Sequence, residues 1–164
     1  LEALSLQREL PRQLPEAIRE QAVAALVALG FANENLASAT EAVTSAIQQT
    51  LDDEDGGRWL LSASHAQAHS ELALTMNDAG IVRDIVIDRT FIDNATGVRW
   101  VVDYKSSKPG PGVSRSHFLR EEAERYQGQL QRYRDAARTL GPEPVHCALY
   151  FTSLGLLHEL SDLA

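Results

Sequence analysis

The chain has 164 residues, of which 44% are hydrophobic and 23% are charged, and its formal net charge is −8. This length suits one domain with a buried core, and the composition is ordinary for a soluble globular protein. No apolar run approaches the roughly 18 residues of a membrane span, and no basic-then-apolar start resembles a signal peptide. We therefore expect a single domain, residues 1–164, that has no membrane partner.

Cys147 is the only cysteine in the sequence, which excludes an internal disulfide and a cysteine-built zinc or iron–sulfur site. It lies in the apolar run 145–151, where we expect a buried small hydrophobic residue rather than a reactive thiol. This cysteine usage fits a reducing, cytoplasmic location. The chain begins with leucine rather than methionine, so we expect a piece of a longer protein.

The negative net charge disfavours a nucleic-acid partner at first sight, but the charge is unevenly distributed. Residues 99–138 contain nine Lys/Arg and five acidic residues, a net charge of +4, which leaves −12 for the remainder of the chain. A local basic segment can still face phosphates, because salt screens charges beyond roughly 8 Å. Charge alone, however, favours an ordinary solvated helix face.

The first part of the chain, residues 1–57, is predicted to be helical. Apolar residues recur at helical spacing over residues 14–29. A second helix is expected to begin at Ser38, because Ser38 and the three residues after it have the form of a capping box. The acidic residues 52–55 and the glycine pair 56–57 are expected to end this helix in a loop.

Beyond residue 70 the sequence changes to the two-residue period and β-branched composition of strands. The short turns between the first three strands predict an antiparallel meander. A long helical pattern over residues 118–140 separates them from two further strands. Helices and strands in this order predict an α/β domain with helices on the faces of a sheet. The predicted strands are residues 71–76, 81–92, 98–105, 145–152 and 156–160.

Two aspartates, Asp88 and Asp103, interrupt strands that are otherwise apolar. A lone aspartate at a strand end is usually a turn or capping residue, but Lys105 follows Asp103 on the same face of its strand. Because a tight turn joins the two strands, the aspartates can be neighbours in space. Two carboxylates beside a lysine perturb each other's pKa unless a cation lies between them, and Mg²⁺ prefers such oxygen ligands. The lysine could then hold the attacking water and stabilise charge developing on phosphorus.

Asp88, followed by Asp103-x-Lys105 at the end of the next strand, resembles the PD-(D/E)xK nuclease core, whose αβββαβ order matches the expected elements. Within that superfamily the chain is most similar to the RecB/AddA branch. The resemblance implies a restriction-endonuclease-like α/β fold with a mixed sheet flanked by helices, in which residues 70–164 form the catalytic core. The segments that carry it are Val86–Arg89, Val101–Ser106 and the helical pattern Tyr126-x-x-Gln129-Leu130-x-x-Tyr133.

The resemblance also implies a Mg²⁺-dependent deoxyribonuclease in which Mn²⁺ can replace Mg²⁺. Asp88, Asp103 and the backbone carbonyl of Tyr104 would bind the metal. Lys105 would be the catalytic lysine, with the two aspartates acting in catalysis through the metal. Glu71, at the start of the first strand, could serve as an outer acid of the same site.

Three residues of the long helix complete the implied site. Gln129 would orient the lysine, the water or a phosphate, and Gln129, Tyr133 and Tyr126 would contact DNA. Gln129 and Tyr133 are an i, i+4 pair and can reach a common site, although an ordinary half-buried helix face would explain them equally well on their own.

The implied biological setting is DNA end processing and recombinational repair. The substrate would be single-stranded DNA delivered by a UvrD-like helicase, present in the same polypeptide or as a partner subunit. No GxxxxGK[ST] loop occurs here, so ATP would act only through a helicase domain absent from this chain.

The sequence departs from the family pattern in two places. Ile85 stands where the family usually has glycine, and no histidine precedes His65, whereas RecB-like nucleases take a metal ligand from a histidine on an upstream helix. We expect that helix to precede Leu1, so that this chain alone cuts slowly or not at all. His65 and His69 are expected to be core or surface residues. Two alternatives stay open: a catalytically degenerate module that binds DNA or holds a helicase complex together, and a stand-alone nuclease without a helicase.

Overall fold

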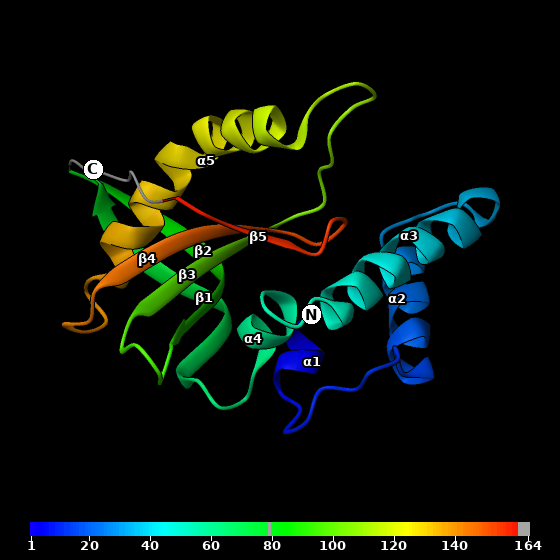
Figure 1. Cartoon of the computed structure of the whole chain (residues 1–164), viewed down its shortest axis with the longest axis horizontal. Coiled ribbons are helices and arrows are strands. Elements are labelled where there is room, and N and C mark those ends of the chain that lie inside the picture. Colours follow the sequence, from blue (N-terminus) through cyan, green and yellow to red (C-terminus); the bar gives the residue numbers. More distant parts are fainter. Residues whose placement is uncertain (79, 161–164) are drawn as a thin grey trace.

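The structure is a computed structural model that describes residues 1–78 and 80–160 (Figure 1). Its centre is a five-stranded sheet in the order β1-β2-β3-β4-β5. β3 and β4 are parallel, and the other neighbours are antiparallel, so the predicted meander of the first three strands is confirmed. The strands are β1 (Ala66–Asp78), β2 (Ile81–Ile92), β3 (Arg99–Lys105), β4 (Val145–Phe151) and β5 (Leu156–Glu159).

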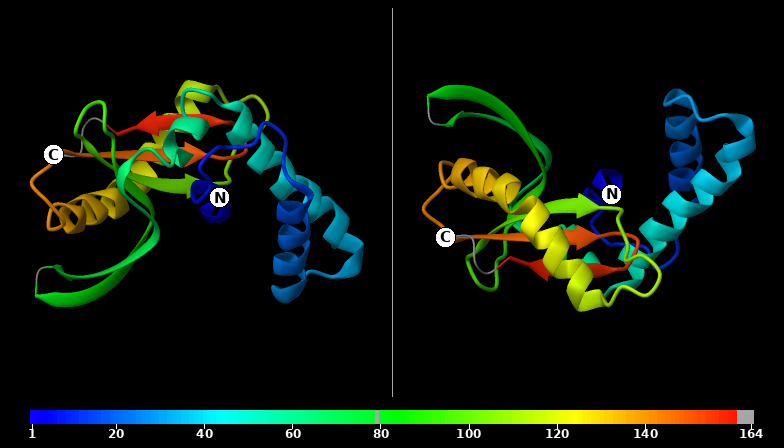
Figure 2. Two further views of the ribbon diagram at one scale, coloured as in Figure 1. Left: turned by 90° about the horizontal axis from the view of Figure 1, so that it is seen from below. Right: turned by 90° about the horizontal axis from the view of Figure 1, so that it is seen from above.

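Helices cover both faces of this mixed sheet, which makes the fold α/β, as predicted. α5 lies across one face, α1 and α4 lie on the other, and α2 and α3 form a helical pair that extends away from the sheet (Figures 1 and 2). None of the helices in the described part of the chain is long and apolar enough to cross a membrane. The helices are α1 (Glu2–Ser5), α2 (Glu16–Ala28), α3 (Asn33–Asp52), α4 (Gly57–Leu61) and α5 (Arg115–Ala137).

Two hydrophobic clusters hold the layers together, one on each face of the sheet. Val102 packs with Leu60 on the α4 side, whereas its neighbour Val101 packs with Leu130 on the α5 side. This alternation is the expected consequence of the two-residue strand period, and a parallel pair of strands is normally covered on both faces. Cys147 lies in the α5 cluster, and burial raises the pKa of its thiol to about 12, which confirms it as an inert core residue.

The boundaries of two predicted helices were wrong. α3 begins at Asn33 rather than Ser38, whose hydroxyl donates to the carbonyl of Asn35 inside the helix instead of capping it. The capping-box pattern that begins at Ser38 therefore lies inside a helix that starts earlier, and it does not mark the first residue of that helix. α5 begins at Arg115 rather than Phe118, because the side chain of Ser114 accepts the backbone N–H of His117 and caps the helix there.

The glycine pair 56–57 was predicted to form a loop, but α4 begins at Gly57. The carboxylate of Asp53 accepts the backbone N–H groups of Gly56 and Gly57, at 3.1 and 2.8 Å, and the hydroxyl of Tyr150 also donates to it. These hydrogen bonds satisfy the free N–H groups at the start of a short helix. The acidic run thus ends α3 as predicted and also starts the next helix.

The β1–β2 ribbon is longer than the sheet it belongs to. β2 pairs with β3 only over residues 89–92, whereas its pairing with β1 continues to the end of the hairpin at Ile81. Residues 72–78 and 81–87, which we call the arm, therefore extend beyond β3 as two strands (Figure 2). The arm bends where it leaves the sheet, because Glu71 there has a φ of +51°, which is uncommon for a residue other than glycine.

Candidate functional site

Asp88 lies at the point where β2 separates from β3. The ladder between these strands ends at the pair Arg89–Val102. One step further, the backbone N–H of Tyr104 donates to Oδ2 of Asp88 at 2.8 Å. The aspartate side chain thus supplies the acceptor that the main chain of β2 would have supplied if the ladder had continued.

β2 also changes its orientation at Asp88. Ile87 packs in the α5 cluster, whereas Phe91 packs in the α4 cluster, although residues four apart on a regular strand share one face. This bend turns the half-buried Asp88 carboxylate toward β3. The sequence alone predicted a carboxylate at a strand end, but not the separation of β2 from β3 that orients it.

Asp103 and Lys105 lie on one face of β3, as their spacing predicted. The Lys105 ammonium forms an ion pair with Oδ2 of Asp103, and the side-chain amide of Gln129 donates to Oδ1 at 3.0 Å. Asp103 is only 2% exposed. Burial raises the pKa of its carboxyl, and the charge of Asp88 raises it further, whereas Lys105 and Gln129 act in the opposite direction.

The lysine is held by an aromatic ring as well as by the carboxylate. The Lys105 ammonium lies 3.7 Å from the centre of the Tyr126 ring, and its side chain is 15% exposed. This is a cation–π contact, in which the negative face of the ring attracts the cation. The resemblance implies DNA binding for Tyr126, and no sequence pattern predicted this contact.

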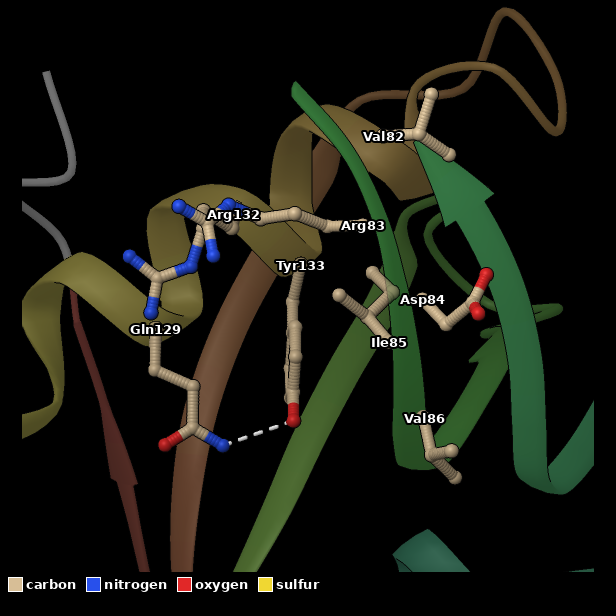
Figure 3. A pocket seen from close by; sticks show the side chains of 8 residues that line it. All are labelled: Val82, Arg83, Asp84, Ile85, Val86, Gln129, Arg132 and Tyr133. Atoms are coloured by element: carbon tan, nitrogen blue, oxygen red, sulfur yellow. Dashed lines mark hydrogen bonds between the residues drawn. The ribbon is translucent and has the colours of Figure 1, made fainter. Parts of the chain in front are cut away.

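α5 brings Gln129 and Tyr133 to the site because the helix face that adjoins them is anchored in the core. Leu130 and Ala137 are fully buried against the sheet. The amide of Gln129 donates to the hydroxyl of Tyr133 at 2.9 Å, in addition to its bond with Asp103 (Figure 3). Burial raises the pKa of Tyr133, and the negative charges of Asp103 and Asp88 raise it further.

Apart from Glu71, the structure brings the predicted site residues to the C-terminal end of β3. Glu71 is exposed, and its charge contributes to raising the pKa of Tyr104, so it lies in the neighbourhood without a direct contact. His65 is buried elsewhere: its Nε2 lies 2.6 Å from the carbonyl of Trp59 and its ring stacks on Phe91, which confirms it as a core residue. The gathered residues are Asp88, Asp103, Tyr104, Lys105, Tyr126, Gln129 and Tyr133.

An open cleft of about 590 Å³ leads to this site. Residues 82–86 of the arm form one wall, and Gln129, Arg132 and Tyr133 of α5 form the other (Figure 3). The volume is within the range of roughly 300–1,000 Å³ that is typical of ligand sites. Arg132 and the arm were not predicted from the sequence, because the cleft depends on where the arm bends.

The donor set consists of two carboxylates, a backbone carbonyl, an ammonium group, an amide and a phenol. Within residues 1–78 and 80–160, no group of three or more His, Cys, Asp or Glu side chains is placed to hold a metal ion. Comparison with protein-family models and with curated proteins gives no match for this chain.

Proposed function

We propose that this chain is a Mg²⁺-dependent DNA nuclease module with a PD-(D/E)xK core, which acts with an ATP-dependent helicase in DNA end processing. The observation that carries the proposal is the gathering of Asp88, Asp103 and Lys105 at the point where β2 and β3 separate. The position of α5 between β3 and β4 in the chain supports the αβββαβ order that the resemblance requires.

The oxygen atoms at this point suit Mg²⁺. This ion is usually bound by one or two carboxylates and completes its shell with waters and substrate phosphates. Asp88 and Asp103 are such carboxylates, and hydrogen bonding engages only Oδ2 of Asp88 within the described chain. The carbonyl of Tyr104 points to the same side of β3 as its N–H, which faces Asp88, because both groups of a strand residue point the same way.

The electrostatics of Asp103 also favour a cation. Burial raises its pKa, which means that the ionised carboxylate lacks full compensation despite the ion pair with Lys105. Gln129 fixes the orientation of this carboxylate by donating to Oδ1. A divalent ion would supply the charge compensation and the activation of water and phosphate that hydrolysis requires.

Lys105 would act on the reacting phosphate. Its ammonium contacts both Asp103 and the Tyr126 ring, and its side chain remains 15% exposed. From this position its ammonium can donate a hydrogen bond to a phosphate oxygen or hold the attacking water. Tyr133 lines the cleft, where it can contact the DNA backbone.

The proposal is tested by cleavage of an end-labelled single-stranded oligonucleotide in Mg²⁺, Mn²⁺ or EDTA. Lys105→Ala is compared with Lys108→Ala, which removes a neighbouring exposed lysine. We expect metal-dependent cleavage that Lys105→Ala abolishes and Lys108→Ala retains. Because the resemblance implies an upstream histidine ligand, the N-terminally extended protein is assayed in parallel. Cleavage that persists unchanged in folded Lys105→Ala would refute the proposal.

A second candidate is a DNA-binding module without catalysis. It is favoured by the ion pair between Lys105 and Asp103, which compensates part of the charge of one of the two carboxylates at the site. The same assay separates the two candidates. DNA binding without cleavage by either the short or the extended protein would favour the second candidate.

A further inference from the structure

Arg89 follows Asp88 on β2, but its side chain lies on the α4 side of the sheet and is only 2% exposed. Its Nε donates to the carbonyl of Leu60 and its Nη1 to the hydroxyl of Ser70, both at 3.2 Å. Its Nη2 has no hydrogen-bond partner among the described residues, and none of their carboxylates forms an ion pair with it. A buried charge is normally paired, so this arginine carries an uncompensated positive charge into the core.

Arg99, which is buried to the same degree, shows how a carboxylate compensates such a charge. Its guanidinium forms an ion pair with Glu143 at 3.4 Å and donates to the side-chain oxygen of Gln67 at 2.6 Å. Arg89 contacts neutral groups instead, including the Phe91 ring, whose centre lies 5.7 Å from the guanidinium carbon. Burial lowers the pKa of the Arg89 guanidinium, as expected for a charge removed from water. An external anion would compensate Arg89 as Glu143 compensates Arg99.

Arg89 lines a pocket of about 470 Å³, within the range of roughly 300–1,000 Å³ that is typical of ligand sites. Ser5 and Ser70 line the same pocket, and their hydroxyl oxygens lie 3.3 Å apart. Since the Ser5 hydroxyl donates to the carbonyl of Glu2 at 2.8 Å, the proton in the contact between the serines comes from Ser70. That contact is longer than an ordinary O–H···O hydrogen bond, so the Ser70 hydroxyl can turn to a better acceptor. The pocket therefore has two neighbouring donors, the guanidinium and this hydroxyl.

Apolar side chains line the pocket as well. They are Leu6, Ala63 and Ala68. β1 has an irregular register between Ala66 and His69, beside the pocket, and such bulges are common next to functional sites. Gln67, within the bulge, has a φ of +46°, which is uncommon for a residue other than glycine. A ligand that reaches the two donors therefore also meets an apolar surface.

The charges around the pocket favour an anion with a single negative charge. Arg89 supplies one positive charge, and the exposed Glu2, which also lines the pocket, disfavours a ligand with two negative charges. Nε2 of His65 is already 2.6 Å from the carbonyl of Trp59, and burial lowers the pKa of this histidine, so it adds no positive charge at neutral pH. A carboxylate has one charge, and its two oxygens can accept from a guanidinium and a neighbouring hydroxyl.

We infer that this pocket binds a small monocarboxylate with a short apolar body, whose carboxylate accepts from the Arg89 guanidinium and the Ser70 hydroxyl. The pocket lies on the α4 side of the sheet, whereas Asp103 and Gln129 meet on the α5 side. The inference goes beyond the proposed nuclease function and does not depend on it.

The test is a titration of the isotope-labelled protein with sodium butyrate, followed by amide chemical shifts at constant ionic strength. We expect saturable shifts at Ser70 and Arg89. Butyramide has nearly the same shape without the charge and should bind at least about tenfold more weakly, because a hydrogen bond to a charged group is lost. Equal affinity for butyrate and butyramide, or no shifts with butyrate, would overturn the inference. Inorganic phosphate bound more tightly than butyrate would overturn the assignment to a carboxylate.

Ser70→Asp supplies the carboxylate from within the protein. Ser70 lies directly opposite Arg89 in the β1–β2 ladder. The variant should unfold at a temperature about 2–4 °C higher than wild type, because opposite charges in a cross-strand pair are stabilising, and it should no longer bind butyrate. Ser38→Asp is the matched control, since it adds the same charge at an exposed position on α3 and should bind butyrate as wild type does. Wild-type affinity for butyrate in Ser70→Asp would overturn the inference.

Glu2→Gln tests the remaining charge at the pocket. Removal of this negative charge should tighten butyrate binding about two- to fourfold and leave butyramide binding unchanged. All these substitutions leave the buried Arg89 in place, so no result depends on whether the fold tolerates its loss. Butyrate binding that Glu2→Gln weakens or leaves unchanged would overturn the placement of the ligand carboxylate in this pocket.

Discussion

The backbone N–H of Tyr104 donates a hydrogen bond of 2.8 Å to Oδ2 of Asp88, so a side chain of β2 pairs with the main chain of β3 where the two strands separate. One carboxylate therefore has two separable properties. Its oxygen accepts a hydrogen bond that supports the fork in the sheet, and its charge is available to a cation. An uncharged side chain of the same shape would retain the first property and lose the second.

This separation predicts different effects of two substitutions at Asp88. Asp88→Asn keeps an oxygen acceptor for the Tyr104 N–H and should unfold at nearly the wild-type urea concentration. Asp88→Ala leaves that N–H without its acceptor and should lower the free energy of unfolding by about 1–3 kcal/mol. Both should lose metal-dependent cleavage because both lose the charge. Equal stability of the two variants in urea titrations would show that the hydrogen bond does not support the fork.

The sequence pattern predicted which residues lie together at this site, but it did not predict the bend of the arm that shapes the site. The two-residue period of strands places Asp103 and Lys105 on one face, and the helical period places Gln129 near Tyr133. Both relationships are local, and the structure has both. The bend of the arm depends instead on the conformation of Glu71 and on where the β2–β3 ladder ends, which no short-range pattern encodes.

Helix boundaries were harder to predict for a similar reason. Ser38 belongs to a sequence that could cap a helix, but α3 starts at Asn33 and continues through it. α4 was missed because its first residue is Gly57, which usually signals a loop. Glycine is used there for space: a Cβ would overlap the carbonyl oxygen of Thr50 and lie 2.5 Å from the hydroxyl oxygen of Tyr150.

That close packing predicts a clear loss of stability in Gly57→Ala. The added methyl group cannot be accommodated without moving α4 away from α3 or Tyr150, which should cost about 1–3 kcal/mol. Gly128→Ala is a suitable control, because it adds the same group to a helix where space is available. Thermal unfolding should therefore shift downward for the first variant and upward for the second. A Gly57→Ala protein as stable as wild type would contradict the packing described for α4.

The buried carboxyl of Asp103 predicts a pH dependence of stability. Burial raises its pKa above the ordinary value of 3.8, so the folded chain binds this proton more tightly than the unfolded chain does. The free energy of unfolding should then fall, relative to Asp103→Asn, as the pH rises from about 4 through the pKa of the folded state. Lys105→Ala removes an interaction that lowers this pKa and should move the change to higher pH. Urea titrations across this pH range would check the prediction. Parallel curves of unfolding free energy against pH for wild type and Asp103→Asn would contradict it.

The hydrogen bond from Gln129 to Asp103 predicts energetic coupling between α5 and β3. Gln129→Ala removes the donor to Oδ1 of Asp103, whereas Tyr133→Phe leaves that bond in place. In a double-mutant cycle of Gln129→Ala with Asp103→Ala, unfolding should show a coupling energy of about 1–2 kcal/mol, because the acceptor is charged and buried. Additive effects would mean that the amide does not stabilise the carboxylate. Tyr133→Phe is the matched control, and it should lower the free energy of unfolding by a smaller amount.

The contact between Lys105 and Tyr126 allows a test of whether Tyr126 holds the lysine or binds DNA, the role that the resemblance implies. If the ring holds the ammonium in place, Tyr126→Phe retains the contact and should cleave and bind DNA nearly as wild type does. Tyr126→Leu keeps an apolar side chain but removes the ring, so it should slow cleavage by up to about tenfold, in keeping with a cation–π contact of about 0.5–1 kcal/mol or more. Single-turnover cleavage rates and oligonucleotide affinities are measured for both variants. If Tyr126 acts instead by donating its hydroxyl to the DNA backbone, Tyr126→Phe should weaken DNA binding as much as Tyr126→Leu does, and that result would assign the residue to the DNA rather than to the lysine.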